Sequence, residues 1–172
     1  MLRREVFRQV SDDPGAVLHA LGIVVLVAMA KGLGAMGVVG SEIREGVDLG
    51  SLAERLIAMW VIVMATAVGW VLWSVVSYLL ASRFLKGGAQ YRQVLRVLGL
   101  SYAPGTLQAL SPLPLVGPYI NAAAVIWVLV VSVVALHEIQ EIDWLGTVLA
   151  VFLGWVMFFV ILPLVVMAPP PA

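Results

Sequence analysis

The chain has 172 residues, a formal net charge of zero and a hydrophobic fraction of 62%. Only 12% of its residues are charged, whereas soluble domains average about 25%. So few charges cannot cover a water-soluble globule of this size, and the composition therefore excludes soluble, disordered, collagen-like and coiled-coil proteins. We predict an integral membrane protein, in agreement with the mean hydropathy of +1.06.

A short amphipathic helix is predicted over residues 1–13. Leu2, Val6 and Val10 recur at i, i+4 and i+8, and arginine and glutamate take most of the positions between them. A helix of this kind lies on a membrane surface with its apolar face in the lipid.

Five apolar runs follow, and a run of roughly 20 residues is long enough to cross the hydrocarbon core of a bilayer. We therefore predict an all-α fold, in which five transmembrane helices form a single membrane domain over residues 1–172. The third run is uncharged, but it holds several polar residues and three prolines. The predicted spans cover about residues 16–39, 56–81, 97–116, 119–136 and 144–167.

The first run also has features of a signal peptide, because the Ala-Met-Ala sequence at residues 28–30 resembles a cleavage site. Asp12 and Asp13, however, lie where a signal peptide carries positive charge, and the apolar character resumes after Lys31. A first span that stays in the protein is therefore the favoured interpretation.

Basic residues predict the orientation in the membrane. With the N-terminus inside, the inner side holds seven Lys and Arg residues and the outer side holds two. Because cytoplasmic loops carry an excess of basic residues, we predict a cytoplasmic N-terminus and a C-terminus outside.

Residues 87–104 contain a glycine pair, a short basic and aromatic helix, and a span that opens with aromatic, small and proline residues. This stretch resembles the signature of the Ypt-interacting-protein (YIP-domain) family of polytopic membrane proteins. Residues 7–14 are similar to the lead-in of that family, and residues 136–138 to the junction between its fourth and fifth helices. The positions that match the motifs are Gly88, Tyr91, Tyr102, Pro104 and Glu138.

The resemblance implies five spans with a cytoplasmic N-terminus. In the eukaryotic members that the chain resembles, a long cytosolic N-terminal region binds Rab-type GTPases and serves vesicle traffic between the ER and the Golgi. About 15 residues precede the first span here, so we expect no counterpart of that region. The short form is typical of prokaryotic members, which implies the inner membrane as the location.

The loop between the second and third spans is basic. Its cations are Arg83, Lys86, Arg92 and Arg96, and Arg92 and Arg96 are four residues apart on a short helix. Such a cluster binds anionic lipid headgroups or an acidic protein partner. The alternative is that it only anchors the loop on the cytoplasmic side.

Polar residues within the spans predict a second candidate site. They share faces of helices, and prolines break one of these helices, so they could line a substrate cavity. The alternative is that they form hydrogen bonds between helices. Lys31 lies within a predicted span. Such a lysine either belongs to a functional site, extends its ammonium to the membrane surface, or pairs with a buried partner. The candidate cavity residues are Lys31, Thr66, Ser101, Gln108, Asn121 and Ser132.

The remaining ionisable residues favour no cofactor. His137, Glu138, Glu141 and Asp143 could bind a divalent cation, but their spacing matches no metal motif, and solvation or pairing with the basic loop is favoured. His19 and His137 could form an axial pair for heme, although no other feature supports it. The absence of cysteine excludes thiolate metal sites. We therefore expect neither a metal nor a cofactor.

From these observations we predict a membrane-organising or interaction protein that acts through its cytoplasmic loops. Its predicted partners are membrane lipids and an unknown membrane or cytosolic protein, and the neutral net charge argues against nucleic acid. The alternative function is a small transporter or channel with a polar cavity among the second, third and fourth spans. Small residues four apart, as in Gly146-Ala150-Gly154, make a second copy of the chain a further candidate partner. No constellation for nucleophilic catalysis is recognisable in the sequence, so we do not expect an enzyme.

Overall fold

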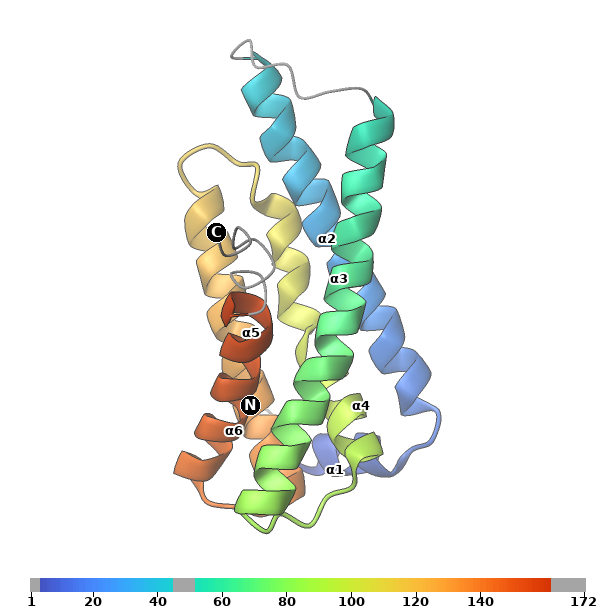
Figure 1. The fold of residues 1–172 in the computed structure, drawn as a ribbon, viewed down its shortest axis with the longest axis vertical. Coiled ribbons are helices and arrows are strands. Elements are labelled where there is room, and N and C mark those ends of the chain that lie inside the picture. The colour runs from blue at the N-terminus through green and yellow to red at the C-terminus, as the bar shows by residue number, and fades with distance from the viewer. Residues whose placement is uncertain (1–3, 45–51, 162–172) are drawn as a thin grey trace, which may run out of the picture.

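The computed structural model describes residues 4–44 and 52–161, and these ranges are helical with short connections (Figure 1). The α-helices are α1 (Arg4–Asp12), α2 (Ala16–Arg44), α3 (Leu52–Leu79), α4 (Tyr91–Ser101), α5 (Gly117–Gln140) and α6 (Trp144–Val156). Shorter stretches extend or follow them, namely the π-helical turns η1 (Leu80–Phe84) and η3 (Met157–Ile161) and the 3₁₀-helix η2 (Ala103–Leu110). The prediction of an all-α protein is confirmed.

The helices form an elongated bundle with α1 across one end (Figure 1). α2 and α3 pack along each other, and α4 with η2 lies between α2 and α5. α6 packs against α3 and α5, while α1 contacts α4 and α5. From α2 onward, successive segments run alternately away from and toward the end that holds α1 (Figure 1).

Three stretches are long and apolar enough to cross a membrane: Ala16–Gly34, Leu56–Phe84 and Gly117–Gln140. At about 1.5 Å of rise per residue, the shortest of them is about 28 Å long, close to the thickness of about 30 Å of a bilayer core. They fall in the first, second and fourth predicted spans. Trp144–Val160 is a shorter apolar helix in the fifth, and residues 162–167 of that prediction lie outside the described residues.

The third predicted span, residues 97–116, is not one continuous α-helix. α4 begins earlier, at Tyr91, and ends at Ser101, after which the chain continues as η2 with Pro104 in its first turn. Two more prolines follow in the turn between η2 and α5. Proline has no amide hydrogen and disfavours the α conformation of the residue before it, so these residues break the helix that hydropathy alone predicts.

The core is built around Trp73 on α3, which is fully buried. Its indole N–H donates to the carbonyl of Val151 on α6 at 2.9 Å, and its ring meets Tyr102 edge-on with 5.6 Å between centroids. A Cβ at Gly154 would lie 2.9 Å from the Trp73 ring, so the small residues of α6 serve close packing within the chain. These contacts hold α6 against α3.

Candidate functional site

One end of the bundle carries exposed cations on the connection between α3 and α4. Arg83 lies in η1, Lys86 in the loop formed by residues 85–90, and Arg92 in the first turn of α4. All three side chains are exposed, and α1 lies across the same end (Figure 1). Arg83, Lys86 and Arg92 are called the basic surface below.

Gln140, in the last turn of α5, holds the loop of residues 85–90 in place. Its buried side chain accepts a hydrogen bond at Oε1 from the amide of Ala89 at 3.1 Å, and its backbone carbonyl accepts from the amide of Gly88 at 3.3 Å. The amide of Gly87 donates to the carbonyl of Ala81 at 3.0 Å. The basic surface is therefore carried by a backbone of defined shape.

Gly87 is the member of the glycine pair that this loop requires. A Cβ at Gly87 would overlap Oε1 of Gln140, whereas a Cβ at Gly88 would meet no atom within 4 Å. We expect Gly87→Ala to displace the Gln140 side chain and to lower the free energy of unfolding by about 1–3 kcal/mol, as overpacking does. Gly88→Ala is the matched control, with an expected change within about 0.5 kcal/mol. Thermal unfolding in detergent measures both, and an equal loss in the two variants would contradict the role of Gly87.

Arg96 is separated from the basic surface by α1. Its side chain is only 8% exposed, and its Nη1 donates to the carbonyl of Ser11 at 2.6 Å. Next to it, Nε2 of Gln93 donates to Oδ1 of Asp12 at 3.0 Å, and Phe7 of α1 is buried in the same contact. A cation at the C-terminal end of a helix also meets the negative end of the helix dipole. Arg96 therefore holds α1 on α4.

The four cations predicted as one cluster are thus split into three exposed residues and one buried residue. Arg92 and Arg96 share a helix, but α1 packs over the part of α4 that Arg96 occupies. Helix spacing within the sequence does not reveal this contact, because it depends on how α1 folds back over the end of the bundle.

Two tyrosines join the end of α3 to the start of α4. The rings of Tyr78 and Tyr91 meet edge-on with 5.8 Å between centroids. The ring pair and the hydrogen bonds of Gln140 together fix the loop of residues 85–90 at both of its ends.

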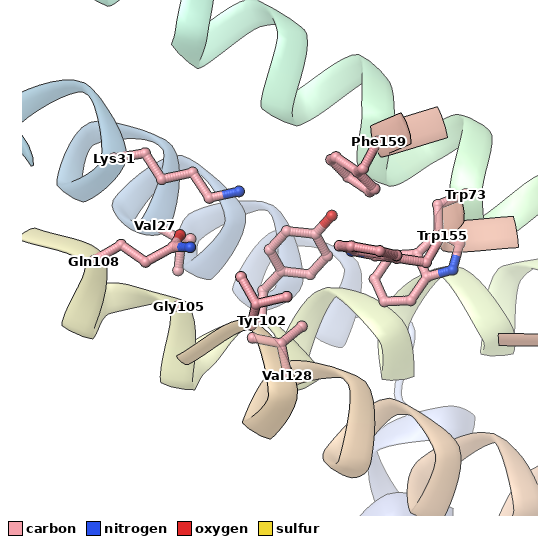
Figure 2. A pocket seen from close by; sticks show the side chains of 10 residues that line it. Val27, Lys31, Trp73, Tyr102, Gly105, Gln108, Val128, Trp155 and Phe159 are labelled. Atoms are coloured by element: carbon pink, nitrogen blue, oxygen red, sulfur yellow. The ribbon is translucent and has the colours of Figure 1, made fainter. Parts of the chain in front are cut away.

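A second candidate site is a cavity of about 120 Å³ inside the bundle (Figure 2). Lys31 extends toward it from α2, and its Nζ lies 5.8 Å from the centroid of the Tyr102 ring and 5.7 Å from that of Phe159. Such cation–π contacts contribute roughly 0.5–2 kcal/mol. They offset part of the roughly 2.5–3.5 kcal/mol that a lysine costs at the centre of a transmembrane helix.

Aromatic rings make up much of the cavity wall (Figure 2). Trp155 is stacked on Phe159 with 5.9 Å between centroids, and Trp73 meets Phe159 edge-on at 6.2 Å. Of the aromatic residues in this wall, only Tyr102 is among the site residues predicted from the sequence. Trp155 and Phe159 are four residues apart in the last apolar run, so their position on one helix face is the signal that could have predicted it.

Two of the six predicted cavity residues, Lys31 and Gln108, line this cavity. Asn121 is exposed and lies outside it, although its Oδ1 accepts a hydrogen bond from Nε2 of Gln108 at 2.9 Å. The others, Thr66, Ser101 and Ser132, are buried elsewhere among the helices. Ser101 donates from its hydroxyl to the carbonyl of Val97, one turn earlier in α4.

The residues considered for a metal lie around the turn between α5 and α6. Asp143 caps α6, because its Oδ2 accepts from the amide of Gly146 at 3.0 Å, and the ring of His137 stacks on Trp144 at 3.8 Å. In the part of the chain that the structure describes, no group of three or more His, Cys, Asp and Glu residues could hold a metal ion. Asp143 therefore has a structural role at this turn.

A family model described as the Yip1 domain matches residues 3–167. The chain belongs to the Yip1 domain family. The match includes every helix described above, and it confirms the resemblance on which the sequence prediction rests. No curated protein and no solved structure matches the chain. Membership of the Yip1 domain family and the three long apolar helices agree on a membrane protein.

In this Yip1 domain the motif residues lie at both candidate sites. Gly88 lies in the loop of residues 85–90 and Tyr91 is the first residue of α4, both beside the basic surface, and Glu138 is buried near the end of α5. Tyr102 lines the cavity, and Pro104 lies in the first turn of η2. α4 therefore connects the basic end of the Yip1 domain to its interior cavity.

Proposed function

We propose that this Yip1 domain is a membrane-organising protein, not an enzyme, that binds anionic lipid headgroups at the cytoplasmic face of a prokaryotic inner membrane. The observation that carries the proposal is the exposure of Arg83, Lys86 and Arg92. The loop between them is hydrogen-bonded to Gln140 of α5. A cation near an anionic membrane surface contributes about 1 kcal/mol, so three together favour anionic over neutral lipid by roughly 100-fold.

The position of α1 supports the same proposal. α1 crosses the end of the bundle that carries the basic surface (Figure 1). The sequence predicts that its apolar face enters the lipid, but Phe7 and Val10 instead pack against the bundle, so α1 is held at this end by protein contacts. Anionic lipids gathered around this end would form a local charged surface at which a further membrane or cytosolic protein docks.

We further propose five spans, with the N-terminus in the cytoplasm and the C-terminus outside. The three long apolar stretches are the first, second and fourth spans, while α4 with η2 and α6 with η3 serve as the third and fifth. The alternating direction of these segments supports an odd number of crossings (Figure 1). The basic surface lies at the end from which α2 starts, and the excess of basic residues on cytoplasmic loops supports the orientation.

The natural absence of cysteine allows a direct test of this orientation. Lys86→Cys and Leu115→Cys place single thiols at exposed positions in turns at opposite ends of the bundle. A membrane-impermeant maleimide is expected to label the Leu115→Cys variant in intact spheroplasts, and the Lys86→Cys variant only after the membrane is opened. Labelling of both thiols from the same side would contradict the five-span topology.

Lipid binding is tested with purified protein in zwitterionic detergent, to which phosphatidylglycerol or phosphatidylcholine is added. We expect phosphatidylglycerol to be retained preferentially in native mass spectrometry. The variant Arg83→Gln/Lys86→Gln/Arg92→Gln is expected to lose that preference by at least about tenfold. Arg83→Lys/Arg92→Lys is the matched control, because it keeps the charge and should keep the preference. A triple glutamine variant with an unchanged preference would overturn the proposal.

A further inference from the structure

The interior cavity holds the Lys31 ammonium and the Gln108 amide, whose bonding is incomplete, and the hydroxyl of Tyr102 faces the same space (Figure 2). The ammonium of Lys31 lies over the rings of Tyr102 and Phe159, but no carboxylate among the described side chains forms an ion pair with it. The side chain of Gln108 is only 7% exposed; its Nε2 donates to Asn121, while its Oε1 has no hydrogen-bond partner in the described part of the chain. Buried acceptors are rarely left in this state.

The two groups make different demands on a ligand. An ammonium requires an anion, whereas an amide oxygen requires a hydrogen-bond donor. Figure 2 shows the Lys31 ammonium and the Gln108 amide facing the same space from α2 and η2. A bound water molecule would satisfy Gln108, but it would leave the ammonium without a counter-charge, which is costly where water is scarce.

The rest of the cavity favours an apolar group. Trp155, Phe159 and Val128 face it with rings and methyl groups, and ligand sites commonly combine such a wall with a few polar groups that orient the ligand. A volume of about 120 Å³ admits a molecule of a few non-hydrogen atoms. The cavity is also distinct in position from the basic surface, because it lies among the helices rather than on the connection between α3 and α4.

We propose that the cavity binds a small hydroxycarboxylate. Its carboxylate pairs with the ammonium of Lys31, its hydroxyl donates to Oε1 of Gln108, and its short alkyl part packs against Phe159 and Trp155. This ligand supplies each missing partner at once, which neither a halide, a simple alkyl carboxylate nor water does. Binding at this site does not depend on lipid binding at the basic surface.

The experiment compares three probes of nearly equal size: lactate, propionate, which lacks the hydroxyl, and lactamide, which lacks the charge. Trp73 and Trp155 line the cavity, so tryptophan fluorescence of the purified protein reports binding. We expect a saturable response to lactate, with propionate about 3–10-fold weaker and lactamide at least about tenfold weaker. The signal is assigned to the cavity by its reduction in Trp155→Phe.

Variants of the two polar residues separate their contributions. Lys31→Gln is expected to weaken lactate binding at least about tenfold, whereas Lys31→Arg, which keeps the charge, retains most of it. Gln108→Leu is expected to abolish the preference for lactate over propionate. Ser132→Ala, which removes a buried hydroxyl outside the cavity, leaves that preference in place.

A thermal melt of each variant shows that it is folded, and a rise in melting temperature with lactate provides a second readout. The proposal is overturned by equal responses to the three probes, by no response to any of them, or by lactate binding that persists unchanged in a folded Lys31→Gln protein. Equal responses would mean that the cavity takes small molecules without selecting for a carboxylate or a hydroxyl, and no response would mean that it does not bind a small hydroxycarboxylate.

Discussion

Replacement of Trp73 by alanine is expected to lower the free energy of unfolding by about 3–5 kcal/mol, the usual range for removing a buried aromatic side chain. Trp73 is fully buried, donates a hydrogen bond to α6 and contacts the rings of Tyr102 and Phe159. Within a membrane the association of helices depends on packing rather than on burial from water, so the cavity that alanine leaves cannot be offset by lipid. Thermal unfolding in detergent micelles measures the loss.

Two further variants separate the causes of this loss. Trp73→Phe keeps an aromatic ring but loses the bond to Val151, and we expect a cost of about 1–2 kcal/mol. Trp60→Ala removes the same side chain from the same helix at a position that is 59% exposed, and we expect a change within about 0.5 kcal/mol. If Trp60→Ala and Trp73→Ala were equally unstable, the core would not be organised around Trp73.

The long apolar helices could be predicted from the sequence because their signal is local. A run of roughly 20 apolar residues needs no knowledge of its neighbours to be assigned to the bilayer, and α2, α3 and α5 were found in this way. α1 was found from its 3.6-residue periodicity, which is equally local. The motif at residues 87–104 is short, but the Yip1 domain match confirms the family that it resembles.

Hydropathy does not predict the break in the helix after Ser101, although the prolines that cause it are present in the sequence. Hydropathy averages over the whole run of residues 97–116, whereas Pro104 acts on a single turn of backbone. The apolar run therefore predicted one helix, and the structure has α4 followed by η2.

The roles of Arg96 and Gln140 could not be predicted because they depend on contacts between distant segments. Arg96 bonds to Ser11 and Gln140 to Ala89, across 85 and 51 positions of the chain. From the sequence alone Arg96 is indistinguishable from Arg92, since both are cations on one short helix. Similarly, the sequence predicts Lys31 and Gln108 as cavity residues, but the aromatic rings beside them come from α3, the junction of α4 and η2, α6 and η3.

Replacement of Arg96 by alanine is expected to release α1 while the bundle stays folded. A hydrogen bond that involves a charged group contributes about 1.5–3 kcal/mol, so its loss should raise the population with α1 detached by about 10–150-fold. Hydrogen exchange of the backbone amides of residues 4–12 measures this population directly. The melting temperature of the bundle should fall little, because Trp73 and its neighbours are untouched.

Arg92→Ala is the matched control, since it removes the same charge from the same helix at an exposed position. Exchange in residues 4–12 should be unchanged in this variant, whereas its preference for phosphatidylglycerol should decrease. Arg96→Ala should show the opposite result, with faster exchange in residues 4–12 and an unchanged preference for phosphatidylglycerol. If both variants instead lost lipid preference equally and kept α1 protected, Arg96 would belong to the basic surface after all, and the division between a lipid-binding set and a buried clamp would be wrong.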